Sequence, residues 1–94
     1  MYREQLQYFA LAYQLRSFSA AAKKIPMSSQ GLAKAVHSLE SELEVILFES
    51  DSAGRLRPTP QADLLLDFVS VFENNYANLR AEYQAMRAAE RHEL

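Results

Sequence analysis

The polar side chains that could do chemistry gather in one short segment of this 94-residue chain. Residues 28–37 include two adjacent serines, a glutamine, a lysine and a histidine. Hydroxyl, amide, ammonium and imidazole groups can donate hydrogen bonds to phosphate oxygens and to acceptor atoms on base edges. This chemistry suits the recognition of another molecule better than the breaking of a bond. The residues concerned are Ser28, Ser29, Gln30, Lys34 and His37, with Ala33 among them.

Catalysis and metal binding find little support in the chain. The absence of cysteine excludes disulfides, thiolate nucleophiles and thiolate metal ligands. His37 and His92 are far apart in sequence, and no serine stands in a recognisable pattern with a histidine and a carboxylate. His37 and Glu40 are one helical turn apart, but two ligands are too few for a metal site. We therefore expect neither an enzyme nor a bound cofactor or metal ion.

The elements around this segment have the pattern of two helices joined by a tight turn. The chain from Ala20 to Ile25 predicts a short helix, Pro26 interrupts it, and residues 29–43 predict a longer amphipathic helix. Ser28 stands where it can cap the second of these helices. Such a pair presents a recognition helix to the major groove of DNA, although any small helical hairpin has the same spacing.

Hydrophobic spacing assigns a buried face to each long helix of this part. The first helix is expected from Arg3 to Leu15, and Ser17 or Ser19 can cap the helix that follows. The positions expected to be buried are Leu6, Phe9, Ala10 and Tyr13 in the first helix, Leu32, Val36, Leu39 and Leu43 in the helix at 29–43, and Phe18 between the helices.

Beyond residue 43 the pattern changes from helical to extended. Residues 45–49 are β-branched and aromatic, and turn residues follow up to Gly54, which is expected to have a positive φ. This predicts two short strands joined by a loop, which we call the wing. Arg55 and Arg57 project from the same side of the second strand, where they could contact phosphates or the minor groove. Two solvated arginines on a hairpin are the alternative interpretation.

A long helix is expected after Thr59, which can act as its N-cap with Pro60 in the first position. No glycine or proline follows Pro60, so the helix can continue to about residue 89. Apolar residues recur along it at spacings of three and four, which is a heptad pattern. The members of this heptad series are Ala62, Leu65, Val69, Phe72, Tyr76, Leu79, Tyr83 and Met86, and a shorter second stripe consists of Leu64, Phe68 and Val71.

The long helix carries more apolar side chains than a small domain can cover. A winged domain of about sixty residues cannot reach the far end of a rod that rises about 1.5 Å per residue. We therefore predict a homodimer through this helix rather than a helix that folds back on its own domain. The residues expected at the dimer interface are Leu65, Val69, Phe72, Tyr76, Leu79, Tyr83 and Met86.

Composition and charge limit the partners and the location. Residues 1–57 carry a net charge of +1 and residues 58–94 a net charge of −3, so only the front part favours an approach to phosphates. Neither a signal peptide nor an apolar run of about 18 residues is evident, so we expect a cytoplasmic, nucleoid-associated protein without a membrane partner. The expected fold is mainly α with a small two-stranded β wing. It divides into a winged helix-turn-helix at residues 1–58 and a dimerisation helix, or linker helix, at residues 59–94.

With these elements in place, the sequence resembles the N-terminal DNA-binding domain of LysR-type transcriptional regulators. The resemblance covers about residues 3–90, and its most specific part is the string LE-x-x-L-x-V-x-LFE from Leu39 to Glu49. The other matching residues are Leu6–Phe9, Ser17–Ala22, Met27–Ser28, Leu32, Lys34, Val36 and Thr59.

The resemblance implies a bacterial regulator that binds operator DNA as a dimer. Its recognition helix would enter the major groove of double-stranded DNA, its wing would lie near the minor groove, and its linker helix would pair antiparallel with its copy. Carried over by position, the DNA contacts would be Ser28, Ser29, Gln30, Ala33 and Lys34 in the helix and Arg55 in the wing. His37, one turn beyond Ala33, and Arg57 are added from helix and strand geometry.

Some positions depart from the family pattern. Ser29, Ala33 and Ser50 stand where the family commonly has Gln, Ser and Arg, and Glu44 stands where a glycine often ends the helix. The alternative is therefore a dimeric winged-helix module for protein interaction, with weakened DNA binding. Family members usually continue into an effector domain that is absent from this sequence, so we expect an excised DNA-binding domain rather than a natural short protein.

Overall fold

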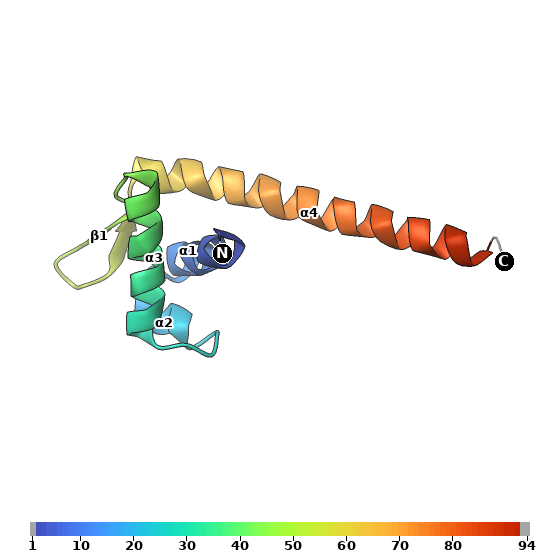
Figure 1. Cartoon of the computed structure of the whole chain (residues 1–94). Coiled ribbons are helices and arrows are strands. Elements are labelled where there is room, and N and C mark those ends of the chain that lie inside the picture. Colours follow the sequence, from blue (N-terminus) through green and yellow to red (C-terminus); the bar gives the residue numbers. More distant parts are fainter. Residues whose placement is uncertain (1, 93–94) are drawn as a thin grey trace.

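Six helices and strands follow one another in the computed structural model, which describes residues 2–92. They are α1 (Tyr2–Leu15), α2 (Phe18–Ala22), α3 (Ser29–Leu43), β1 (Phe48–Ser50), β2 (Leu56–Pro58) and α4 (Pro60–His92). In Figure 1, α4 projects as a long rod from the group formed by the other elements, and the molecule measures 64 × 27 × 20 Å. The predicted fold class, mainly α with a two-stranded wing and a long C-terminal helix, is confirmed.

Hydroxyl side chains start three of the helices. The hydroxyls of Ser17, Ser28 and Thr59 each accept a hydrogen bond from the backbone amide three residues later, at 3.1, 3.0 and 3.2 Å. Each bond satisfies one of the amides that the first turn of a helix leaves unpaired. Pro60 opens α4, where its missing N–H removes no helical hydrogen bond. α3 and α4 therefore begin at the residues that the sequence predicts.

The position of α2 differs from the prediction. Because Ser17 rather than Ser19 provides the cap, the helix begins at Phe18 and not at Ala20. It ends at Ala22, which leaves Ile25 in the turn that leads to α3. Ile25 still packs against the core formed by α2 and α3, although its predicted helical conformation is wrong.

The wing is shorter than the extended sequence pattern. β1 begins at Phe48 instead of residue 45, and it pairs antiparallel with β2 in a register that places Glu49 opposite Arg57. At the turn, the Asp51 carboxylate accepts hydrogen bonds from the amides of Ala53 and Arg55, both at 2.9 Å. Gly54 has a φ of 80°, as predicted.

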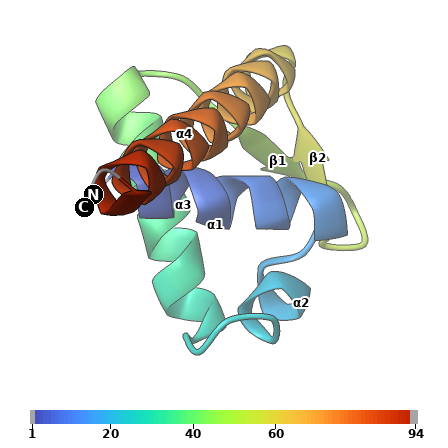
Figure 2. The same ribbon diagram turned by 90° about the vertical axis from the view of Figure 1, so that its right-hand side faces the viewer.

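Two clusters of buried side chains form the core. Phe9, Leu39 and Leu47 join α1, α3 and the approach to β1, while Ala21, Ala22 and Leu32 hold α2 against α3. Figure 2 shows α1 crossing between α3 and the wing, beneath α4. Leu43, which was predicted to be buried, is 43% exposed because it lies in the last turn of α3, beyond the region that α1 covers.

α4 is anchored to the winged part by its first turns. The Thr59 hydroxyl donates to the Ile46 carbonyl oxygen at 2.6 Å, and Ala62 and Val69 are buried in the core with Phe9. Leu65 is half-buried and packs against the same cluster. Their own domain thus covers Val69 and part of Leu65, and the place of these two residues at a dimer interface stays a prediction.

α1 also holds α4 through polar contacts at both of its ends. Near its C-terminal end, the Tyr13 hydroxyl donates to Asp63 Oδ1 at 2.6 Å. This hydrogen bond to the carboxylate raises the pKa of Tyr13, since it favours the protonated phenol. Near its N-terminal end, the Arg3 guanidinium lies 3.8 Å from the Glu73 carboxylate and 4.4 Å from the centre of the Tyr76 ring. The direction in which α4 leaves the domain is thus set on both sides.

Glu44 ends α3 in a left-handed conformation, with φ 57° and ψ 42°. Such a backbone conformation brings Cβ of an L-residue close to its carbonyl oxygen, whereas glycine adopts it freely. α3 therefore ends in the left-handed turn that glycine favours, although the residue at this position is a glutamate.

We expect Glu44→Gly to stabilise the fold by about 1 kcal/mol, since the relief of left-handed strain exceeds the entropy that glycine loses on folding. Urea unfolding at a fixed protein concentration measures the effect. Ser41→Gly, one turn earlier in the same helix, is the control and should destabilise the fold. Equal losses of stability in both variants would contradict the explanation.

Candidate nucleic-acid interface

The outer face of α3 presents the polar residues singled out in the sequence. Gln30, Lys34 and His37 are exposed, and they follow one another along one side of the helix. Ser29 and Ala33 are half-buried on the edge of this face. Ser28 is exposed, but its hydroxyl is engaged as the cap of α3. The freely projecting donors of the face are therefore the amide of Gln30 and the ammonium of Lys34.

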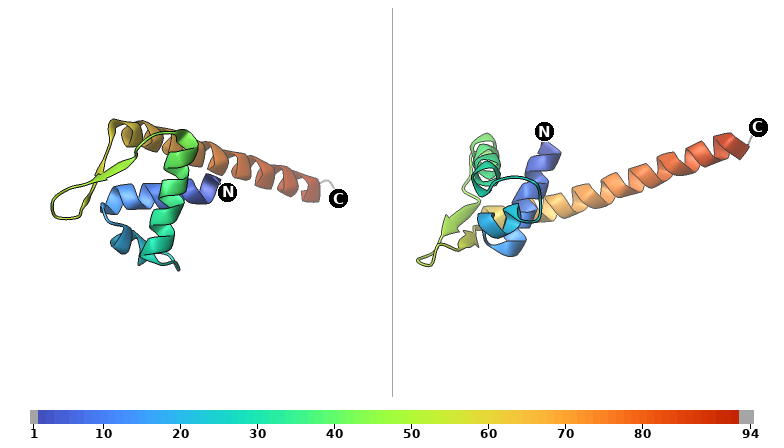
Figure 3. Two further views of the ribbon diagram at one scale, coloured as in Figure 1. Left: turned by 60° about the vertical axis from the view of Figure 1, so that its left-hand side comes forward. Right: turned by 90° about the horizontal axis from the view of Figure 1, so that it is seen from below.

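The start of α3 and the wing border one shallow hollow of about 340 Å³. Ser29, Gln30 and Ala33 line it from α3, and Ser50 and Gly54 line it from the wing. The remaining lining residues belong to the start of α2 and to β2: Ser17, Phe18, Ser19 and Leu56. Figure 3 shows the wing extending beside α3 as a separate loop. The fold thus brings the start of α3 beside the wing, whereas the other candidate residues do not line this hollow: Ser28, Lys34, His37, Arg55 and Arg57.

Arg55 and Arg57 are both exposed on the wing, with the buried Leu56 between them. The alternation of a strand explains this placement, because residues two apart project to the same side. Neither arginine forms an ion pair within residues 2–92. The two charges are available to a partner that approaches the wing.

His37 is held in place by two side-chain contacts. Its Nδ1 lies 2.8 Å from Glu40 Oε1, and its ring stands edge-on to Phe18 with the centroids 6.0 Å apart. The other ring nitrogen remains available on the exposed side of α3. The two contacts fix the direction of the imidazole before any partner arrives.

Glu40 has a role that the sequence reasoning missed. Its side chain is only 12% exposed. Its Oε2 accepts hydrogen bonds from the amides of Leu47 and Phe48, at 2.6 and 3.3 Å. A carboxylate that accepts two backbone donors ties the start of the wing to α3. The sequence feature that could have indicated this role is the spacing along the chain between Glu40 and Leu47–Phe48 in the LE-x-x-L-x-V-x-LFE string.

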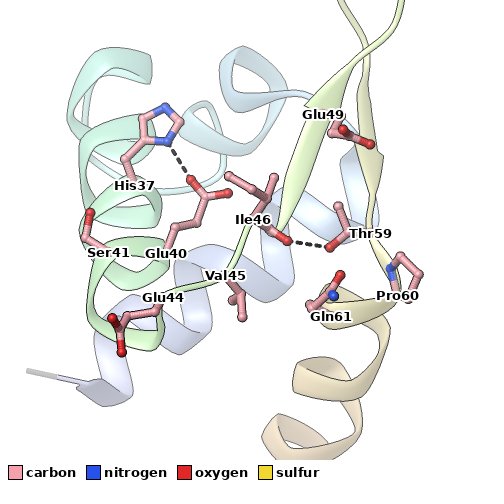
Figure 4. Close-up of a pocket in the computed structure, with 10 residues that line it drawn as sticks. All are labelled: His37, Glu40, Ser41, Glu44, Val45, Ile46, Glu49, Thr59, Pro60 and Gln61. Atoms are coloured by element: carbon pink, nitrogen blue, oxygen red, sulfur yellow. Dashed lines mark hydrogen bonds and ion pairs between the residues drawn. The ribbon is translucent and has the colours of Figure 1, made fainter.

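A second, larger hollow of about 800 Å³ lies between the end of α3, the approach to β1 and the start of α4. Figure 4 shows its lining side chains: His37, Glu40, Ser41, Glu44, Val45, Ile46, Glu49, Thr59, Pro60 and Gln61. We call it the α3–α4 hollow. The Glu40 carboxylate is already bonded to His37 and to the two backbone amides. Glu44 and Glu49 are exposed and form no ion pair within residues 2–92.

Neither a metal centre nor a membrane span is found in the described part of the chain. Within residues 2–92, no three His, Asp or Glu side chains are grouped so that they could hold a metal ion. In the same range, none of the helices is both long and apolar enough to pass through a bilayer.

The comparison with known families identifies the winged part. The model of the lysR family of bacterial regulatory helix-turn-helix proteins matches residues 3–63, which are 61 of the 94 residues. The chain belongs to the lysR family. No curated protein sequence matches it.

Solved structures of lysR-family proteins and their DNA-binding domains share the whole arrangement. The DNA-binding domain of BenM in complex with catB site 1 DNA superposes with a TM-score of 0.85 at 21% identity, over 96% of both chains. The CbnR DNA-binding domain bound to DNA gives 0.83 at 22% identity, over 90% of this chain and 97% of that one. Full-length OxyR C199D from Pseudomonas aeruginosa gives 0.78 at 27% identity, over 90% of this chain but only 28% of the OxyR chain.

We expect Lys34→Ala to weaken binding to duplex DNA and to lower the slope of log K against log salt by about 1, because one phosphate contact would be lost. Fluorescence anisotropy over a series of salt concentrations measures both quantities. Lys23→Ala removes an exposed charge before the turn and is the matched control. An unchanged slope for Lys34→Ala would rule out a phosphate contact for this side chain.

For the wing, we expect Arg55→Ala combined with Arg57→Ala to reduce the salt slope by up to about 2 and to weaken binding. The thermal unfolding midpoint should stay close to that of the parent chain, since both side chains are exposed. Anisotropy with A·T-flanked duplexes provides the measurement. Affinity equal to that of the parent protein would show that the wing does not contact DNA.

Proposed function

We propose that this protein binds double-stranded operator DNA in a sequence-specific manner, as the DNA-binding part of a bacterial transcriptional regulator. The observation that carries this proposal is the joint placement of the start of α3 and the wing beside one hollow. A helix and an adjacent loop of this kind can address a major groove and the neighbouring backbone together. BenM and CbnR domains of the same fold are bound to DNA in their structures, which supports the proposal.

The exposure and the chemistry of each candidate residue indicate its role in DNA binding. Gln30 is the candidate for reading a base edge, because its amide offers a donor and an acceptor. Lys34, Arg55 and Arg57 provide phosphate contacts, and His37 adds a polar ring nitrogen whose direction Glu40 sets. The side chains of Ser28, Ser29 and Ala33 at the start of α3 are small, and they allow the DNA backbone to approach the helix closely.

The charge distribution fits an orientation with α4 away from the DNA. Residues 1–57 carry +1, and residues 58–94 carry −3. The polyanion therefore attracts the winged part and repels the linker helix. We propose residues 1–58 as the DNA-reading unit and residues 59–94 as the linker. We further propose a cytoplasmic location in association with the nucleoid.

A homodimer through α4 completes the proposed function. One side of α4 carries eight large apolar residues that are 37–66% exposed. We call this the open face, and its members are Leu64, Phe68, Val71, Phe72, Tyr76, Leu79, Tyr83 and Met86. Burial of each such side chain contributes roughly 1.5–3 kcal/mol, so two copies gain by covering each other. The dimer would hold two reading units at a fixed spacing on pseudo-palindromic DNA.

The function is tested by equilibrium anisotropy with a duplex selected from genomic fragments and with a random-sequence duplex, at two salt concentrations. We expect tighter binding to the selected duplex, by a factor of about 10³ or more, and steep weakening with salt on both. Equal and negligible binding to both duplexes by a folded dimer would favour a protein-interaction module instead.

For the dimer, we expect Phe68→Glu to weaken self-association by more than about 100-fold, because a symmetric interface loses an apolar contact in each copy and gains two buried carboxylates. Phe68 is 66% exposed, so the fold of the single chain should survive. Light scattering after size-exclusion chromatography measures the mass. Asn74→Glu, which adds the same charge on another side of α4, is the control. A dimer that tolerates Phe68→Glu as well as it tolerates Asn74→Glu would contradict an interface on the open face.

A further inference from the structure

The extent of the open face of α4 indicates a register in which two antiparallel copies could meet. In an antiparallel pair, residues at equal distances on either side of the twofold axis lie opposite each other. The open face extends from Leu64 to Met86, so an axis between Asn75 and Tyr76 lies within one residue of its centre. This register sets Phe72 opposite Leu79 and Phe68 opposite Tyr83. It covers the full length of the face, whereas a shift by one turn leaves apolar residues uncovered at both ends.

The same register carries the end of each α4 to the domain of the other copy. Asn75 lies opposite the partner's Tyr76 in this register. Gln61 therefore lies opposite the partner's Glu90, and Pro60 lies opposite the partner's Arg91. Pro60 and Gln61 are lining residues of the α3–α4 hollow. The last turns of the second α4 therefore arrive at this hollow.

The chemistry of the hollow complements that helix end. Glu44 and Glu49 place two exposed carboxylates around it, and the C-terminal end of α3 adds its partial negative charge. Ile46, which is 59% exposed, supplies an apolar contact. In the second copy, Arg87 and Arg91 are one turn apart on the same side of α4, are exposed, and form no ion pair within residues 2–92.

We propose that the α3–α4 hollow receives the C-terminal end of α4 from a second copy of this chain, with the partner's Arg87 and Arg91 facing Glu44 and Glu49. The inference rests on the proposed homodimer and adds to it a second contact, outside the helix pair. This contact ties the partner helix to the end of α3, and therefore to the element proposed to read DNA. The spacing of the two reading units is then held at α3 as well as at α4.

Engineered cysteines test the register, because the chain has no thiol of its own. In the full 94-residue chain, Gln61→Cys with Glu90→Cys should give crosslinked dimers with a short bifunctional maleimide. Gln61→Cys with Gln84→Cys is the control, since residue 84 is nearly two turns nearer the axis. Equal yields from the two pairs would overturn the register and the docking with it.

An exchange of charges tests the hollow itself. We expect Arg87→Glu with Arg91→Glu, and separately Glu44→Arg with Glu49→Arg, to weaken dimerisation about tenfold each in low salt. All four changes together should restore it to within about threefold, as the attraction is re-formed with its signs reversed. Ala77→Arg, on the side of α4 away from the open face, should have no comparable effect.

The outcomes separate this inference from the proposed function. A dimer that binds duplex DNA but shows neither the crosslink nor the rescue overturns the docking alone. The crosslink without rescue also overturns it, since the helix pair then lacks the contact in the hollow. A parent chain that stays monomeric overturns both.

Discussion

The first turns of α4 carry apolar side chains on two sides, and the winged part can cover only one of them. Ala62 and Val69 fill the core beside Phe9, and this burial anchors the helix to the domain. Leu64 and Phe68 point away and remain 61% and 66% exposed. The same helix therefore closes the core of its own domain and presents a surface that water solvates poorly. The proposed dimer, and with it the proposed spacing of two reading units, is based on this constraint.

Rigidity around α3 is the second condition for the proposed function. Glu40 ties the start of the wing to α3 through two backbone amides, and Thr59 ties the start of α4 to the carbonyl of Ile46. Tyr13 and Arg3 hold α4 from the side of α1. These contacts hold α3, the wing and the start of α4 in one arrangement.

Local signals made most of the fold predictable from the sequence. The hydroxyl caps, Pro60 and Gly54 act within a few residues, and the start and end of α3 and the start of α4 were predicted correctly for that reason. The side of α4 that is buried was not predictable, because the heptad series describes an apolar face without saying which neighbour covers it. The role of Glu40 depends on backbone amides seven and eight residues away, and a helical pattern does not report such contacts. The assignment of single residues to DNA contacts stays a prediction.

The central claim is that the open face of α4 is covered by a second copy of the chain. Sedimentation equilibrium of the unmodified protein at micromolar concentration tests it most directly, because the mass is obtained without assumptions about shape. The account predicts twice the chain mass of 10.7 kDa, with dissociation on dilution. A single species of 10.7 kDa across that range would contradict it.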